Sequence, residues 1–347
     1  MLQASFQKHT LNFKRPSGTS RGVLNTKETY FLFIKSEESF GVGECGLLRG
    51  LSIDDRADYE EELMGVCENI ELGVNQLDLY EALEEFPSIQ FGVETAFKSL
   101  YSKNPFELYP SQFTSGEAAI PINGLVWMGD KNFMKQQISE KLKEGFICIK
   151  MKIGAIDFKT ELGLLKSIRK EFSASEVELR VDANGAFSPN EALEKLKMLS
   201  DLNLHSIEQP IKQGQWQEMA RLCEETPLAI ALDEELIGIF SEEEKNKLLD
   251  TIKPQFIILK PSLIGGFGGS DSWIKLAEQH NAGWWVTSAL ESNVGLNAIS
   301  QYTFTKNSKL PQGLGTGSLY TNNIDSPLEV SNGTLRYNPT VNWNFQI

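Results

Sequence analysis

Short apolar runs recur along the second half of the chain at nearly constant spacing, and each run ends at a charged or polar residue. The runs are FICIKMKI, VELRVDANG, LHSIEQP, PLAIALDEE, FIILKPS and WWVTSALES. From Lys152 to Asp182 is 30 positions, and the next steps, to Glu208, Asp233 and Lys260, are 26, 25 and 27 positions. A repeat of this length fits one strand followed by one helix. The spacing therefore predicts a parallel barrel whose chemistry lies at the carboxyl ends of its strands.

The two ends of this barrel segment have less regular patterns. The run AAIPINGLVW predicts a first barrel strand, and the helix expected after it, over 132–144, ends at Gly145. The last strand is expected at 312–317, where Gly315 is one of several glycines that would let a ligand approach the backbone closely. The tail LEVSNGTLRYNP predicts a hairpin around Asn332–Gly333.

The first part of the chain predicts a different architecture. ASFQKHTLNFK, TYFLFIKS and FGVGE form a strand meander within residues 1–45, and the polar loop 15–22 joins the first two strands. That loop carries Arg21, which could meet an anionic substrate, although a solvated loop explains the pattern equally well. Helical spacing follows over 52–70, with a serine as candidate N-cap, and again after Pro87.

Composition narrows the class of protein and of partner. The chain of 347 residues is 41% hydrophobic and 23% charged, which suits one large domain and a smaller one. Its formal net charge of −14 would repel a phosphate backbone or an anionic lipid surface, so neither is expected as a partner. Four scattered cysteines indicate neither a disulfide framework nor a zinc cluster. With no signal-peptide pattern and no apolar run near the ~20 residues of a bilayer span, we expect a cytoplasmic protein of undetermined oligomeric state.

Two lysines lie on one of the predicted buried strands. Lys150 and Lys152 are two positions apart, so both side chains point to the same face of the strand. Burying two ammonium groups side by side is costly, and we expect it to depress the pKa of at least one of them. A lysine whose pKa lies near neutrality can act as a general base. An exposed edge strand is the alternative, and the apolar neighbours of these lysines count against it.

Three carboxylates end successive strands. Asp182, Glu208 and Asp233 would repel one another if they converged at one end of a barrel. A hard divalent cation removes that conflict, and oxygen-only ligation suits Mg²⁺, with Mn²⁺ as a substitute. The scarcity of histidine, three in the chain, argues against zinc. A single acidic residue at a strand end is more often the N-cap of the next helix, but three in successive repeats favour a metal site.

Lys260 ends the next strand, and its place in the repeat puts it across the barrel mouth from Lys152. A cation between two opposed lysines suits removal of a proton next to a carboxylate, as is established for enolase-superfamily sites. The sequence therefore predicts a small-molecule carboxylate as substrate.

Five short motifs occur in a characteristic order. They are Lys150-Met151-Lys152, Val181-Asp182-Ala183-Asn184-Gly185, Ile207-Glu208-Gln209-Pro210, Asp233-Glu234 and Leu259-Lys260-Pro261. With these motifs the chain resembles the muconate-lactonizing subgroup of the enolase superfamily over essentially its whole length. The resemblance implies a modified (β/α)₇β barrel over 113–317 and an α+β capping domain over 1–112, with 318–347 packing back on it. It also implies Mg²⁺ on the three carboxylates.

Within that subgroup the stretch Thr287–Gly295, TSALESNVG, is most similar to the o-succinylbenzoate synthases. The resemblance implies syn dehydration of 2-succinyl-6-hydroxy-2,4-cyclohexadiene-1-carboxylate, a step of menaquinone biosynthesis. Lys152 would remove the proton, and Lys260 would supply positive charge on the opposite face. The residues expected to bind the substrate are Lys150, Asn184, Ser288, Glu291, Arg21 and Gly315.

Two other functions stay open at this point. Dipeptide epimerases of the subgroup usually carry an Asp-x-Asp motif at the seventh strand, and this chain has Ser288-Ala289-Leu290 there instead. N-acylamino acid racemases are harder to exclude, because their seventh strand can look similar. A barrel kept as a binding module without catalysis would be expected to have lost part of the ionisable set, which is complete here.

Overall fold

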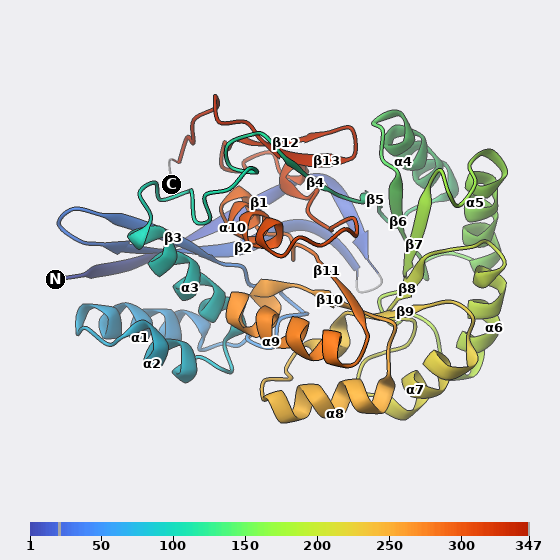
Figure 1. Cartoon of the computed structure of the whole chain (residues 1–347), viewed down its shortest axis with the longest axis horizontal. Coiled ribbons are helices and arrows are strands. Elements are labelled where there is room, and N and C mark those ends of the chain that lie inside the picture. Colours follow the sequence, from blue (N-terminus) through green and yellow to red (C-terminus); the bar gives the residue numbers. More distant parts are fainter. Residues whose placement is uncertain (20–21, 346–347) are drawn as a thin grey trace.

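The computed structural model describes residues 1–19 and 22–345, and its N-terminal part is an antiparallel sheet covered by helices (Figure 1). The elements are β1 (Gln3–Thr19), β2 (Gly22–Lys35), β3 (Phe40–Cys45), α1 (Tyr59–Glu71), α2 (Gln76–Ala82) and α3 (Pro87–Tyr101). β1 and β2 pair from Gln3–Lys35 to Thr19–Gly22, with an irregularity between Asn12 and Ser17. The strand meander is thus confirmed.

The segment 15–22, expected as a loop, differs from the prediction. Ser17 and Gly18 pair with Leu24 and Val23, so both strands continue almost to the hairpin turn. Pairing of Ser17–Thr19 with Gly22–Leu24 satisfies backbone polar groups of these residues. Arg21 lies outside the described residues.

The helix expected over 52–70 begins only at Tyr59. The Ser52 hydroxyl accepts a hydrogen bond from the backbone N–H of Leu48, and Asp54 accepts two from Ser88, so both side chains stabilise a turn. The helix after Pro87 is confirmed as α3, with that proline in its first turn. The short helix α2 was not predicted.

The barrel is a curled parallel sheet whose strands follow one another in chain order, with helices on its outside (Figure 1). Its strands are β5 (Gly124–Val126), β6 (Cys148–Lys152), β7 (Glu178–Asp182), β8 (Ser206–Glu208), β9 (Ile230–Leu232), β10 (Phe256–Leu259) and β11 (Gly283–Val286). Its helices are α4 (Lys131–Lys143), α5 (Phe158–Glu171), α6 (Pro189–Ser200), α7 (Trp216–Glu225), α8 (Glu242–Ile252), α9 (Gly266–Gln279) and α10 (Asn293–Thr305). The predicted fold class is confirmed.

The two ends of the barrel differ from the prediction. The run AAIPINGLVW splits into β4 (Ala119–Pro121), which pairs with the C-terminal hairpin, and β5, which belongs to the barrel. The expected last strand at 312–317 shrinks to single bridges from Gln312 to Ile122 and from Gly313 to Thr287. Glycines leave this segment little side-chain surface to pack, so only its first residues pair with neighbours.

The C-terminal hairpin forms as predicted. β12 (Leu328–Ser331) and β13 (Thr334–Tyr337) flank Asn332–Gly333, where both residues have positive φ, 49° and 67°. β13 pairs with β4. Two parts of 318–347 meet the N-terminal sheet: the backbone N–H of Thr321 donates to the Asn12 carbonyl at 2.9 Å, and Phe345 lies 5.7 Å from Phe31 between ring centroids.

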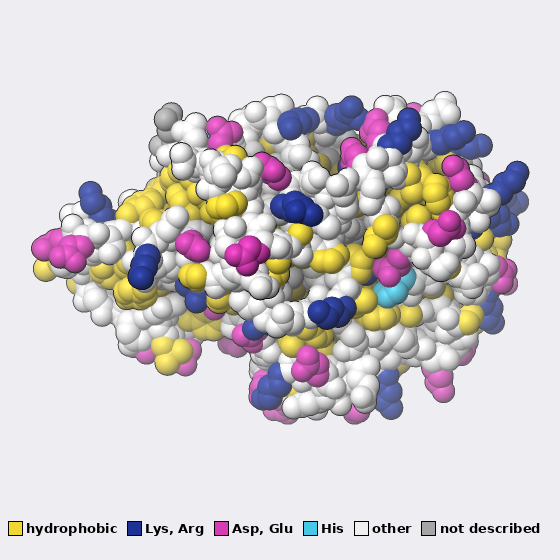
Figure 2. Space-filling model, turned by 45° about the horizontal axis from the view of Figure 1, so that its top comes forward, with side chains coloured by type: hydrophobic (Ala, Val, Ile, Leu, Met, Phe, Trp, Pro, Cys, Tyr) yellow, Lys and Arg dark blue, Asp and Glu magenta, His cyan; other side chains and the backbone are white. Residues whose placement is uncertain are grey.

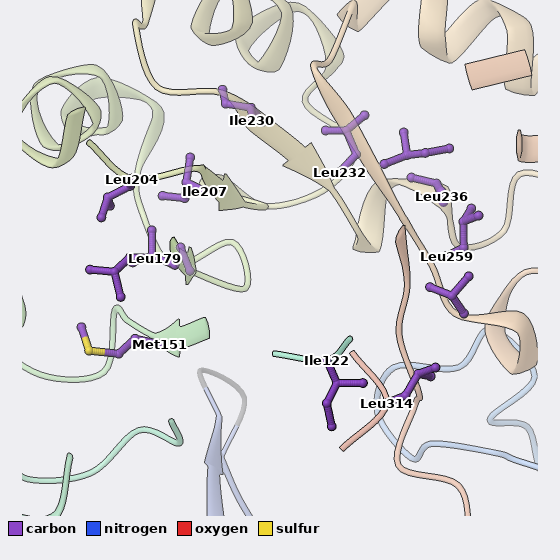
Figure 3. Packing of buried hydrophobic residues seen from close by; sticks show 14 of the residues in the cluster. Ile122, Met151, Leu179, Leu204, Ile207, Ile230, Leu232, Leu236, Leu259 and Leu314 are labelled. Atoms are coloured by element: carbon purple, nitrogen blue, oxygen red, sulfur yellow. The ribbon is translucent and has the colours of Figure 1, made fainter. Parts of the chain in front are cut away.

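The barrel core lies between the strands and the surrounding helices (Figure 3). Met151, Leu179, Ile207 and Leu259 come from β6, β7, β8 and β10 and are fully buried. Since side chains alternate along a strand, burying this apolar set outward turns the charged residues between them inward. The inner floor is filled by Arg180, whose guanidinium lies 4.2 Å from the Trp285 ring centroid.

The outer surface carries both signs of charge. Figure 2 shows Lys and Arg interspersed with Asp and Glu, and hydrophobic side chains in patches between them. Among the described residues, no helix has the length and apolar composition needed to cross a membrane.

Candidate active site

The side chains of Lys150 and Lys152 both lie inside the barrel and are buried. The Lys150 Nζ atom donates to Glu208 Oε2 at 2.7 Å and lies 3.4 Å from Asp182 Oδ2. The Lys152 Nζ atom donates to Asp182 Oδ2 at 2.8 Å and to Asn184 Oδ1 at 2.7 Å. The alternative of a solvated edge strand is therefore wrong.

The three predicted carboxylates stand at the ends of neighbouring strands. Asp182 and Glu208 are register partners at the ends of β7 and β8, and Asp233 follows β9 directly. Lys260, which follows β10, forms an ion pair with Asp233. The inner face therefore brings together three ammonium groups and three carboxylates, and the side chain of Lys260 is the most exposed of them at 12%.

These contacts set the protonation of the buried groups. Burial, together with the Asp182 carboxylate, raises the pKa of Glu208 to about 8. Burial alone would also raise the pKa of Asp182, but the ammonium groups of Lys152 and Lys150 outweigh it and lower that pKa. Burial would lower the pKa of Lys150, but Glu208 and Asp182 outweigh it and raise that pKa. Asp233 likewise raises the pKa of Lys260.

The expected depression of a lysine pKa is therefore wrong for Lys150. The sequence pattern showed two neighbouring cations, whereas the fold gives the Lys150 ammonium group carboxylate partners. Opposite charge at hydrogen-bonding distance favours the charged form more than burial disfavours it.

A cavity of about 1030 Å³ opens above this charged face. Lys150, Lys152, Asp182 and Lys260 contribute to its floor. Its other walls include the paired ends of β1 and β2, the turn Leu48–Leu51, and Gly313–Leu319. The N-terminal sheet thus supplies part of the wall of a cavity whose charged residues come from the barrel.

A family model described as enolase C-terminal domain-like matches residues 134–340, which is more than half of the chain. The chain belongs to the enolase superfamily. Members of this superfamily use a divalent metal ion, usually Mg²⁺.

Individual superfamily members show different degrees of similarity. An o-succinylbenzoate synthase of Desulfotalea psychrophila is 48% identical, covering 96% of this chain and 98% of that protein. The crystal structure of MenC from Desulfotalea psychrophila superposes with a TM-score of 0.86 at 43% identity, covering 96% of this chain and 99% of that one. An N-succinylamino acid racemase of Thermus thermophilus is 31% identical, but over 57% of this chain and 52% of that protein.

The donor atoms of this superfamily member fit a hard divalent ion. Asp182, Glu208 and Asp233 offer only oxygen, and Glu208 Oε1 is buried without a hydrogen-bond partner. An unpaired buried carboxylate oxygen is costly unless a cation or a proton meets it. Within the described part of the chain, no three acidic, histidine or cysteine side chains already form a ready metal-binding group, because each carboxylate turns to a lysine.

The predicted substrate-binding residues fall into two groups. Lys150, Asn184, Ser288 and Gly315 line the cavity. Glu291 does not: it is fully buried beneath the cavity, and its carboxylate accepts hydrogen bonds from the Ser262 and Ser288 hydroxyls. A free carboxylate at a strand end could not be distinguished by sequence from one already bound to neighbouring hydroxyls.

Asn184 links several of these groups through an unusual backbone conformation. Its φ is 43°, which turns its backbone N–H toward Asp182 Oδ1 at 3.0 Å. Its side chain accepts from Lys152 and donates to Glu234 Oε1 at 3.1 Å. Asparagine tolerates this conformation better than most residues, which explains its place in the VDANG motif.

Other cavity residues were missed by sequence reasoning. Trp127 lines the cavity with its ring centroid 5.9 Å from Lys152 Nζ, and the turn Leu48–Leu51 lines it as well. Trp127 ends the first predicted barrel run, so the rule applied to the other strand ends could have found it. The turn gives no such signal, because its position depends on how the N-terminal sheet packs on the barrel.

Proposed function

We propose that the chain is a hydro-lyase that converts 2-succinyl-6-hydroxy-2,4-cyclohexadiene-1-carboxylate into o-succinylbenzoate. The observation that carries this proposal is 48% identity with an o-succinylbenzoate synthase over nearly the full length of both proteins. The buried lysines and carboxylates supply the groups that proton removal next to a carboxylate requires. The free, buried cysteines suit a reducing compartment, and we place the reaction in the cytoplasm, in menaquinone biosynthesis.

Lys152 is the base in this proposal. Its amine takes the proton from the carbon that bears the ring carboxylate, and the electron pair of that C–H bond moves into the ring. The C–O bond on the same face then breaks, and the hydroxyl leaves as water with the proton that Lys152 carried. The lysine returns to its amine form, and aromatisation drives the step. Asn184 and Asp182 hold the Nζ atom in place.

The other charged groups would stabilise the reacting carboxylate. Lys260 lies across the barrel from Lys152 and provides positive charge without transferring a proton. Asp182, Glu208 and Asp233 would hold Mg²⁺, for which Mn²⁺ would be a substitute. When bound, the ion supplies further positive charge to the substrate carboxylate.

The proposal also assigns a role to each part of the chain. We propose that residues 113–317 form the catalytic barrel and that 1–112, together with 318–347, form a cap. The cavity is walled from both parts, and the tail residue Phe345 contacts Phe31 of the N-terminal sheet. Lys150, Asn184, Ser288 and Gly315 would contact the substrate, as would Arg21.

A direct assay tests the proposal. Purified protein with Mg²⁺ is given the cyclohexadiene, and o-succinylbenzoate is followed by its ultraviolet absorbance. We expect turnover that a chelator removes and added Mg²⁺ restores. Absence of turnover under conditions where calorimetry shows bound Mg²⁺ would reject this substrate.

Racemisation of N-acylamino acids is the second candidate, because Lys152 ends β6 and Lys260 follows β10. A racemase needs proton transfer by both Lys152 and Lys260, whereas a syn dehydratase needs it only from Lys152. In deuterium oxide, exchange of the α-proton of N-succinylamino acids at a rate comparable to dehydration would favour this candidate, and its absence would remove it.

A further inference from the structure

The barrel is not closed along its full height between β5 and the segment that follows α10. Backbone hydrogen bonds join Gln312 to Pro121 and Asn123, at 2.8 and 3.0 Å. Beyond them, Gly313 bonds with Val286 and Ser288 of the β11 side instead. Among the described residues, no backbone bond connects β5 with Gly313–Gly317, so one edge of β5 is left unpaired.

The Ile122 side chain borders the resulting gap, and the glycines at 315 and 124 add no side chain to it. A Cβ atom at Gly315 would lie 3.3 Å from Ile122 Cδ1 and 3.8 Å from the Asn123 carbonyl oxygen, so it would point across the gap toward the first strand. On the opposite side, a Cβ atom at Gly124 would lie 3.0 Å from Lys141 Cδ and 3.1 Å from Phe146. A larger side chain at either position would narrow the opening.

The cavity above the lysines extends beyond β5, toward α4 and the C-terminal hairpin, which flank β5 in Figure 1. Its walls there include Leu125 of β5, Phe133 of α4, and Leu328, Val330 and Leu335 of the hairpin. We call this part of the cavity the side channel.

The side channel reaches solvent, and its walls combine these apolar side chains with Gln137, Glu140, Lys141 and Glu144. Val330 at its outer part is 42% exposed. Lys141 Nζ lies 2.6 Å from Glu144 Oε2, and Glu140 accepts a hydrogen bond from the Gln136 side chain at 2.8 Å. The inner end of the channel is different, because the ammonium groups of Lys152 and Lys260 lie there. One cavity thus joins a cationic end to an end with several apolar side chains.

We infer that the side channel is a binding subsite for the unbranched apolar chain of a carboxylate whose head lies at the lysines. The chemical class is the straight-chain monocarboxylates, which would occupy the site as inhibitors. The lysine ammonium groups attract the carboxylate head of the ligand. An unbranched hydrocarbon chain is narrow, which suits a gap bordered by glycines. The inference rests on the proposed function only in assuming that the lysines receive a carboxylate.

Calorimetric titration of the Mg²⁺-loaded protein with butyrate, hexanoate, octanoate and decanoate tests this subsite. Each methylene group that enters the channel should strengthen binding about fourfold, at a stoichiometry of one acid per chain. A dissociation constant that stays level from butyrate to decanoate would overturn the inference.

Two variants test where the hydrocarbon chain of the bound acid lies. Gly315→Val should block the gap and make decanoate bind no more tightly than butyrate. Val330→Asp should weaken decanoate at least tenfold, because it places a carboxylate in the outer part of the channel, while butyrate binding stays within twofold. Val341→Asp is the matched control, since Val341 is 39% exposed and lies outside the cavity wall.

Equal losses in Val330→Asp and Val341→Asp, or an unchanged chain-length dependence in a folded Gly315→Val protein, would contradict the subsite. The outcome is separable from that of the proposed function. A chain-length dependence without dehydratase turnover would uphold the subsite and reject the substrate, and turnover with level affinities would do the reverse.

Discussion

Lys150 and Lys152 are two residues apart on one strand, yet their ammonium groups have different partners. Lys150 lies near two carboxylates, which raise its pKa and hold it as a cation. Lys152 bonds to one carboxylate and to the neutral amide of Asn184. The same two-residue spacing therefore places one ammonium group between two carboxylates and the other beside one carboxylate and one amide.

Glu291 does not line the cavity itself, but it accepts a hydrogen bond from Ser288, which does. Replacing it with glutamine removes the charge that the Ser262 and Ser288 hydroxyls share. Because buried hydrogen bonds to a charged group are lost, we expect the free energy of unfolding to fall by about 1.5–3 kcal/mol. KM should rise more than kcat falls, because Ser288 lines the cavity.

Urea unfolding followed by circular dichroism measures the stability change at Glu291, and steady-state kinetics separates KM from kcat. Exposed Glu243→Gln serves as the control. Equal free energies of unfolding for Glu291→Gln and the control would show that the hydrogen bonds of this carboxylate to Ser262 and Ser288 do not stabilise the fold.

At the scale of elements, β3 of the N-terminal sheet is tied to the start of α10. The fully buried Glu44 carboxylate accepts hydrogen bonds from the backbone N–H groups of Ser292 and Gly295, both at 2.8 Å, and from the hydroxyls of Ser292 and Thr29. A carboxylate at a helix N-terminus satisfies free N–H groups and complements the helix dipole. This contact joins the N-terminal sheet to the barrel.

Glu44→Gln should lower the free energy of unfolding by about 2–3 kcal/mol, because glutamine lacks the charge and has one acceptor oxygen fewer. Guanidinium unfolding monitored by both fluorescence and circular dichroism tests this. Exposed Glu68→Gln on α1 provides the comparison. A loss under 0.5 kcal/mol would mean that the contact between β3 and α10 contributes little.

The turn before α1 contains a buried acid without a cationic partner. Burial raises the pKa of Asp54 to about 6, and its Oδ1 atom has no hydrogen-bond partner. The native state therefore binds more protons than the unfolded chain between about pH 4 and pH 6, so stability falls as pH rises through that window. Above about pH 6 the ionised Asp54 lowers the free energy of unfolding by the full amount, about 3 kcal/mol.

Asp54→Asn should remove this pH dependence and raise stability at pH 8, since the amide keeps an acceptor for Ser88 and carries no charge. Thermal unfolding at pH 5 and pH 8 measures it, with exposed Asp250→Asn as the reference. A variant that is less stable than wild type at pH 8 would contradict the assignment of Asp54 as a destabilising buried charge.

Strand spacing predicted the barrel because buried parallel strands leave a strong periodic signal. The start of α1 was misplaced because Ser52, a good N-cap type, instead bonds to the chain before it. The last barrel strand was predicted to be longer than it is, because glycines permit strand pairing without requiring it. The lysine–carboxylate pairs depend on side chains from different strands, which spacing along one strand does not specify.

At the scale of the whole molecule, the cavity is enclosed by both parts of the chain. Leu11 of β1 packs in one apolar cluster with Trp127, Leu290 and Tyr320, which lie beyond the N-terminal sheet in sequence. This packing holds the hairpin of β1 and β2 over the charged end of the barrel (Figure 1). Removing water there strengthens the electrostatic interactions that the proposed reaction needs.

The central claim is that Lys152 is the base of a Mg²⁺-dependent dehydration. The measurement is o-succinylbenzoate formation from the cyclohexadiene by wild type, Lys152→Ala and exposed Lys247→Ala, each with Mg²⁺ affinity measured by calorimetry. We predict turnover by wild type and Lys247→Ala, and a loss of at least about 10⁴-fold in kcat for Lys152→Ala, with Mg²⁺ still bound. Turnover by Lys152→Ala within tenfold of wild type would contradict the claim.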